Sequence, residues 1–253
     1  MERKNIYFVS DFHLGIPNRT SSLEREKLLV KWLDNVRHNA AEIFLMGDVF
    51  DFWFEYKTVV PKGFVRLMGK LVEITDAGIP VHLFRGNHDL WTFGYLEKEI
   101  GIKLHRKPII REIAGKTFYL AHGDGLGPGD RGYKFLKAIF EFKPNQLLFS
   151  WLHPDIGAWM GNYFSRRSRL AKMSRAGREE ASFDKENELL YNHAREMAET
   201  FPHVDYFVFG HRHMPVMTEI NTKATLVILG DWISHFSYGV FEEGKFRLER
   251  FEE

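Results

Sequence analysis

Five short clusters of Asp, Asn, His and Gly carry side chains that could bind divalent metal ions. In chain order they are Asp11-Phe12-His13, Gly47-Asp48, Gly86-Asn87-His88-Asp89, His122-Gly123-Asp124 and Gly210-His211-Arg212-His213. Each follows a strand-like apolar run, at residues 6–9, 43–46, 81–84, 118–121 and 206–209. Ligands and catalytic groups gather on loops at strand ends, because the strands hold them rigidly and the loops expose them. Carboxylate, amide and imidazole groups suit hard-to-borderline divalent ions, so the sequence predicts a metal centre.

The residue types are those needed for two ions rather than one. Two divalent ions about 3.5–4 Å apart need one carboxylate that touches both, with several terminal ligands. Asp48 is the natural bridge, and Asp11 and His13 can both face one ion because they stand two positions apart. The predicted metal ligands are Asp11, His13, Asp48, Asn87, His122, His211 and His213. Such a centre binds phosphate oxygens and lowers the pKa of a water from ~15.7 towards ~7.

His88 follows a predicted ligand but has no obvious place among the ligands. We therefore predict that His88 acts in catalysis, as a general acid or as a cationic clamp on a phosphate. Asp89 is expected to orient His88 from behind.

Each cluster taken alone has a structural explanation. Asn, Asp and Gly favour turns, and paired histidines are common on surfaces. The joint occurrence of all five, in this order and each after a β-like run, argues against coincidence. Other histidines lack this context: we expect His38, His105, His153, His193 and His203 on surfaces or helix faces and His82 packed in a strand, and we leave the role of His235 open.

The composition describes a globular chain with no strong charge bias. It has 253 residues, a 44% hydrophobic share, a formal net charge of +1 and no cysteine. The length fits one large domain, or one domain with an insertion. The near-zero charge predicts no nucleic-acid partner, and the lack of cysteine excludes disulfides and Cys-ligated zinc. The first residues lead straight into a strand-like run, so we expect no signal peptide, and no apolar run reaches the length of a membrane span.

The order of the expected elements indicates an α/β fold. Strand-like runs alternate with amphipathic helical stretches at residues 23–36 and 64–74, and another helix is expected over residues 188–198. Three short strand-like runs near the C-terminus, at residues 225–229, 239–241 and 246–248, have turns and no helices between them. We expect these three runs in a second, partly antiparallel sheet that packs on the first, with helices outside.

Residues 131–180 remain outside this pattern and are assigned to an inserted helical cap, with residues 1–130 and 181–253 as the core. The cap is rich in aromatics: Tyr133, Phe135, Phe140, Phe142, Phe149, Trp151, Trp159, Tyr163 and Phe164. It also holds a basic run without an acid: Arg166, Arg167, Arg169, Lys172, Arg175 and Arg178. This combination suits an anionic membrane surface, or a substrate with phosphates and acyl chains. The alternative, a cap packed on its own core with a solvated basic face, stays open.

The five clusters resemble the motifs of the calcineurin-like metallophosphoesterase superfamily. Within it, the chain resembles the UDP-2,3-diacylglucosamine diphosphatases of lipid A synthesis over almost its whole length. The details that carry this closer resemblance are Gly47-Asp48-Val49-Phe50-Asp51-Phe52-Trp53, Asp130 and Tyr133, the helical insertion, Met173-Ser174-Arg175-Ala176 with Lys185, and Leu229-Gly230-Asp231-Trp232. One departure is His88, where many members of that family carry Arg.

The resemblance implies a metallophosphoesterase β-sandwich with layers α/β/β/α and an inserted cap. It implies hydrolysis of the pyrophosphate of UDP-2,3-diacylglucosamine to UMP and 2,3-diacylglucosamine 1-phosphate, with two divalent ions, Mn²⁺ foremost. The implied substrate-binding residues are Asn87, His88, Asp130, Tyr133, Arg175, Lys185 and His211. A lipid-nucleotide substrate further implies a cytoplasmic protein that is peripheral on the cytoplasmic face of the inner membrane, with membrane contact through the cap.

Two rival interpretations remain open. One is another capped phosphoesterase, which acts on a nucleotide, a phosphodiester or a different lipid pyrophosphate. The other is a non-catalytic scaffold with the same fold, against which the complete set of predicted ligands argues.

Overall fold

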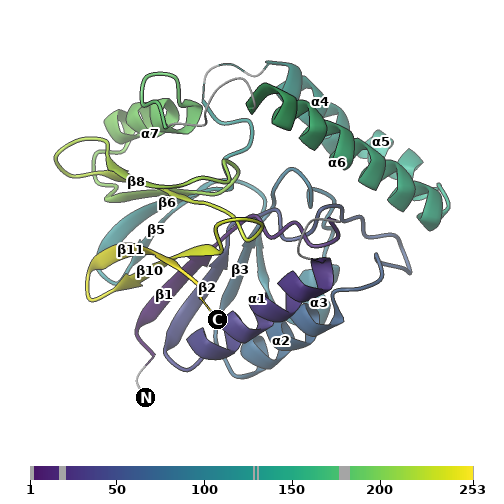
Figure 1. The fold of residues 1–253 in the computed structure, drawn as a ribbon, viewed down its shortest axis with the longest axis horizontal. Helices are drawn as coiled ribbons and strands as arrows, with labels where there is room; N and C mark the ends of the chain where they lie inside the picture. The colour runs from purple at the N-terminus through teal and green to yellow at the C-terminus, as the bar shows by residue number, and fades with distance from the viewer. Residues whose placement is uncertain (1–2, 17–20, 128, 130, 177–182, 253) are drawn as a thin grey trace.

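Two β-sheets pack face to face between outer helices (Figure 1). The computed structural model describes residues 3–16, 21–127, 129, 131–176 and 183–252, apart from the side chains of residues 168–176. The six-stranded sheet has the order β11-β10-β1-β2-β3-β4 and the five-stranded sheet the order β5-β6-β7-β9-β8. The strands are β1 (Asn5–Val9), β2 (Ala40–Leu45), β3 (Val81–Phe84), β4 (Lys103–His105), β5 (Ile109–Ile113), β6 (Lys116–Leu120), β7 (Tyr206–Phe209), β8 (Pro215–Glu219), β9 (Thr225–Leu229), β10 (Ser237–Glu242) and β11 (Lys245–Arg250).

The helices fall into three groups. They are α1 (Ser22–Val36), α2 (Val65–Asp76), α3 (Tyr95–Ile100), α4 (Arg131–Glu141), α5 (Lys143–Ser150), α6 (Pro154–Ala176) and α7 (Leu189–Thr200). Helices α1 to α3 lie outside the six-stranded sheet, and α7 lies outside the five-stranded sheet (Figure 1). Helices α4 to α6 form a separate unit beside the sandwich, and we refer to this unit as the cap (Figure 1).

Strand alternation produces the layers, because successive side chains point to opposite faces of a sheet. In β1, Tyr7 and Val9 pack towards α1, whereas Phe8 packs between the two sheets. In β7, Phe207 belongs to the core beneath α7 and Val208 to the core between the sheets. These strands are buried on both faces, as sheets covered by helices must be. The expected α/β/β/α metallophosphoesterase architecture is confirmed.

The assignment of the three C-terminal strands to one sheet was wrong in part. β9 lies in the five-stranded sheet, but β10 and β11 join the six-stranded sheet as a hairpin. β10 runs antiparallel to β1, with Ile6 opposite Phe241. Turn signals mark where strands end, but they do not say which sheet edge a hairpin will extend. The short elements α3, β4, β5 and β8 were not foreseen, because each is brief and weakly periodic.

Candidate metal centre and active site

The loops that carry the five clusters follow β1, β2, β3, β6 and β7. β1, β2 and β3 run parallel to one another, and so do β6 and β7. Their carboxyl ends therefore share one edge of each sheet, and the loops converge there.

The backbone is strained at these loops. Asp11, His13, Asp48, His211 and His213 all adopt positive φ, between 43° and 67°. L-residues avoid this conformation, and it persists where surrounding structure enforces it, commonly at functional sites. Close approach adds to the constraint, since a Cβ on Gly86 would lie 2.1 Å from Asp48 Oδ1. The fold thus holds the predicted ligands at a conformational cost.

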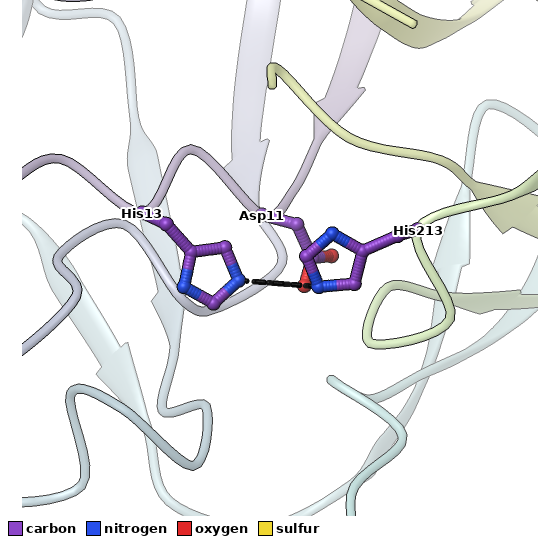
Figure 2. Close-up of side chains that lie close together, drawn as sticks. All are labelled: Asp11, His13 and His213. Atoms are coloured by element: carbon purple, nitrogen blue, oxygen red, sulfur yellow. Dashed lines mark hydrogen bonds and ion pairs between the residues drawn. The ribbon is translucent and has the colours of Figure 1, made fainter. Parts of the chain in front are cut away.

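Asp11, His13 and His213 form the first group of possible ligands (Figure 2). The Nε2 atoms of His13 and His213 lie 3.2 Å apart, and Asp11 Oδ1 lies 3.6 Å and 3.4 Å from them. Two imidazole nitrogens and a carboxylate oxygen aimed at one point suit a borderline divalent ion.

Asp48, His122 and His211 form the second group. His122 Nδ1 lies 2.7 Å from the backbone oxygen of Met46, so this nitrogen carries the proton and Nε2 is the available ligand atom. Asp48 Oδ2 lies 3.4 Å from His122 Nε2 and 3.6 Å from His13 Nε2. One carboxylate oxygen therefore reaches both groups, which is the position that a bridging ligand needs.

Several buried atoms in this region have no hydrogen-bond partner within the described part of the chain. They include Asp11 Oδ1, Asn87 Oδ1 and His122 Nε2. A buried polar atom without a partner costs free energy, so such atoms point to a ligand that completes them. The three atoms belong to predicted metal ligands, and their residues fit a pair of divalent ions.

In the absence of metal, the histidines and carboxylates of the site shift one another's pKa values. Burial acts to lower the pKa of His13, but the carboxylates of Asp11, Asp51 and Asp48 outweigh it and raise that pKa to about 9. At His122 burial is likewise outweighed, mainly by Asp48, and the pKa rises to about 10. Burial acts to raise the pKa of Asp48, yet His122 and its neighbours hold it well below its usual range. In the absence of metal, the protons on these histidines supply the positive charge that metal ions are expected to supply when bound.

Two further carboxylates support the loops and were missed in the sequence. Asp231 Oδ2 lies 3.2 Å from His213 Nδ1, and Asp231 Oδ1 accepts hydrogen bonds from the backbone of residues 233–235. His235, whose role was open, places Nδ1 3.3 Å from Asp231 Oδ1. The other carboxylate, Asp51, lies 3.5 Å from His13 Nδ1. Asp231 does follow a strand, β9, so the signal that marked the other clusters could have found it.

His88 lies at the edge of the centre, held through its Nδ1 atom. That nitrogen lies 2.9 Å from the backbone oxygen of Asp51 and 3.1 Å from Ser165 Oγ on α6. Burial lowers the pKa of His88, and the charge of Asp48 acts in the opposite direction. The expected support from Asp89 needs correction: both Asp89 carboxylate oxygens accept backbone hydrogen bonds, at 2.8 Å from Val49 and 2.6 Å from Gly86. Asp89 therefore ties two loops together, and Asp51 and Ser165 hold His88.

The predicted substrate residues of the cap fall in different surroundings. Tyr133 donates to Asp124 Oδ2 at 2.6 Å, and Lys137 approaches the same oxygen at 2.7 Å. Lys185 lies over the ring of Tyr191 at 5.5 Å, next to α7. Asp130 and the side chain of Arg175 lie outside the described residues. Asn87 and His211 are in the centre itself, where the backbone N–H of His211 donates to Asp11 Oδ2 at 2.8 Å.

The cap exposes much of its apolar surface. Trp151 is 74% exposed, Phe135 70% and Trp159 66%. Arg166 and Arg167 on α6 are exposed as well. None of the helices that the structure describes is both long and apolar enough to span a membrane. Exposed apolar surface of this extent is typical of interaction sites.

The fold and the paired ligand groups define a metallophosphoesterase, and the chain belongs to the calcineurin-like phosphoesterase family, whose model matches residues 4–215. The predicted superfamily and enzyme class are thereby confirmed.

Several of the chain's relatives within this family share one name. The chain is 40% identical to the UDP-2,3-diacylglucosamine hydrolase of Porphyromonas gingivalis, over 99% of each chain. It is 27% identical to that of Vibrio vulnificus, over 91% of this chain and 90% of the relative. The protein of the same name from Stenotrophomonas maltophilia is 26% identical over 96% of each chain.

Proposed function

We propose that this protein hydrolyses the pyrophosphate of UDP-2,3-diacylglucosamine to UMP and 2,3-diacylglucosamine 1-phosphate, a step of lipid A biosynthesis. The observation that carries the proposal is the full-length similarity to a hydrolase of that name, in a chain whose ligand groups meet at Asp48. The alignment covers the cap as well as the core, so it extends beyond the family's shared motifs.

The residues supply separate parts of the reaction. Two divalent ions, Mn²⁺ foremost, would offset the charge of the pyrophosphate and lower the pKa of the attacking water. Asp11, His13 and His213 would hold one ion. The other ion would be held by Asn87, His122 and His211, and Asp48 would bind both ions. His88 keeps Nε2 available to the phosphate or to the leaving group, because its Nδ1 is engaged with Asp51.

The cap supplies the recognition of a lipid. A substrate with two acyl chains must keep those chains out of water while its pyrophosphate reaches the polar centre, and each exposed CH₂ costs about 0.8 kcal/mol. The exposed aromatics of α4 to α6 offer apolar surface, and Arg166 and Arg167 offer charge for an anionic membrane. We infer that residues 131–180 act as a lid that recognises the substrate at the cytoplasmic face of the inner membrane.

Incubation of the purified protein with UDP-2,3-diacylglucosamine and Mn²⁺ tests the proposal. The expected products are UMP and the monosaccharide 1-phosphate, identified by mass spectrometry, and chelation of the metal should stop their release. Cleavage of a chromogenic phosphodiester without release of UMP would contradict the proposed substrate and favour the broader phosphoesterase interpretation.

A further inference from the structure

Helix α6 lies directly on the loop that follows the bridging residue Asp48, along a line of small residues. Gly157, Gly161 and Ser165 are spaced by four, so they share one face of the helix. A Cβ on Gly161 would lie 2.2 Å from the ring of Phe52, and a Cβ on Gly157 would lie 2.0 Å from the hydroxyl of Tyr56. Larger side chains would push the helix off this loop.

Ser165, the last residue of this line, lies next to Asp51 and His88. Its side chain is buried, with 7% of the residue exposed. The hydroxyl donates to Asp51 Oδ1 at 2.9 Å and lies 3.1 Å from His88 Nδ1. The cap therefore touches His88 through the Ser165 hydroxyl on α6.

The hydrogen bonds define which His88 nitrogen carries a proton. The backbone oxygen of Asp51, 2.9 Å from Nδ1, can only accept, so Nδ1 must donate. Since the hydroxyl proton of Ser165 goes to the Asp51 carboxylate, its oxygen, 3.1 Å from His88 Nδ1, faces the same Nδ1–H as an acceptor. The two acceptors hold the ring in one tautomer and one orientation, with Nε2 left for the substrate.

We propose that Ser165 is a positioning residue for His88, so that the cap completes the reaction centre in addition to recognising the substrate. The proposal rests on the proposed hydrolysis at this site. Its chemical consequence is specific: loss of the Ser165 hydroxyl should slow the chemical step for any substrate, including one too small to touch the cap.

Steady-state kinetics on bis(p-nitrophenyl) phosphate with Mn²⁺ tests this consequence. Ser165→Ala should lower kcat by about 10-fold to 100-fold, the effect typical of removing a group that orients a metal-bound histidine, with KM nearly unchanged. Ser165→Thr keeps the hydroxyl and should recover most of kcat. Ser150→Ala is the matched control, since its hydroxyl donates to the Leu147 backbone within α5, and it should behave as wild type.

Nitrogen-15 NMR of the His88 ring in the Mg²⁺-supplied protein gives a readout independent of turnover, with His88→Gln for assignment. The Nδ1–H tautomer should dominate in wild type, and Ser165→Ala should show a mixture or faster exchange of that proton. Unchanged His88 signals together with an unchanged kcat would overturn the proposal and leave Ser165 as a packing residue. Failure to cleave UDP-2,3-diacylglucosamine would contradict the proposed substrate alone, because neither the diester assay nor the NMR signal depends on it.

Discussion

At the scale of single residues, Asp48 is the point where both ligand groups meet. Its Oδ2 lies within 3.6 Å of a histidine from each group, whereas Asn87 offers one oxygen to one side. Asp48→Ala should therefore lose both ions and reduce kcat by at least ~10³, while Asn87→Ala should weaken mainly one ion. Elemental analysis after dialysis checks this prediction. Two equivalents of metal in Asp48→Ala would contradict the bridging assignment.

His88 should contribute to the chemistry without holding metal. His88→Ala is expected to keep both ions and lower kcat by ~10²–10⁴, the typical range for a general acid or base. His88→Arg distinguishes the two roles, because a permanent cation preserves a clamp but cannot transfer a proton near neutral pH. Metal content and kcat are the measurements, and loss of metal from His88→Ala would show that it is a ligand.

Metal binding should release protons, because the metal-free site carries raised histidine pKa values. His13, at about 9, and His122, at about 10, are protonated at pH 7, and an ion can bind only their neutral forms. Each Kd should therefore fall by about tenfold per pH unit from pH 7 towards pH 9, and titrations in buffers of different ionisation enthalpy should count about one proton per ion. Affinity that is independent of pH in this range would contradict the prediction.

The convergence of the predicted ligand residues could be anticipated from the sequence because each lies within a few residues of a strand end, where type and spacing are visible. Asp51 could not be linked to His88 in the same way. Its contacts join the loop after β2 to the loop after β3 and to helix α6. Asp51 and Ser165 on α6 are more than a hundred residues apart in the sequence. Such contacts depend on how the cap packs, and local patterns do not encode that.

At the scale of elements, helix periodicity was the most dependable signal. α1, α2 and α7 end within about two residues of the expected limits, because each buries one apolar face on a sheet. α1 also begins with a capping box between Ser21 and Glu24. The hairpin of β10 and β11 was placed in the wrong sheet because its pairing with β1 is non-local.

The attachment of α4 to the core gives a prediction for Tyr133. Its hydroxyl donates to a buried carboxylate, Asp124, near the predicted ligand His122, so Tyr133→Phe should weaken this attachment by about 1.5–3 kcal/mol. Hydrogen exchange of residues 131–141 should then become faster by roughly tenfold to a hundredfold. Tyr163→Phe on the exposed face of α6 is the matched control.

The same variant tests the substrate role that the family resemblance implies for Tyr133. An increase in KM for UDP-2,3-diacylglucosamine with unchanged exchange in α4 would favour direct substrate contact. Faster exchange with a modest kinetic change would favour a role in fixing the cap.

At the scale of the whole molecule, the core and the cap differ in how much apolar surface they expose. The sandwich buries most of its aromatics between sheets and helices, whereas most aromatics between residues 135 and 164 of the cap are exposed. Composition could predict this excess of apolar surface in the cap, since so short a segment cannot bury it alone. The way in which α6 lies against the Asp48 loop depends on glycines at 157 and 161, which carry no chemical signature in the sequence.

The exposed face of the cap should bind anionic membranes. Arg166 and Arg167 lie about two helical turns beyond the exposed Trp159 on α6, and each basic residue near an anionic surface contributes about 1 kcal/mol. Arg166→Glu with Arg167→Glu should therefore weaken binding to phosphatidylglycerol vesicles by at least about thirtyfold at low salt, and the difference should shrink as salt screens the charges. Arg195→Glu, exposed on α7 away from the cap, should have little effect (Figure 1). Vesicle sedimentation measures the binding. If Arg195→Glu lost as much binding as the Arg166 and Arg167 double variant, the binding would depend on net charge and not on the cap.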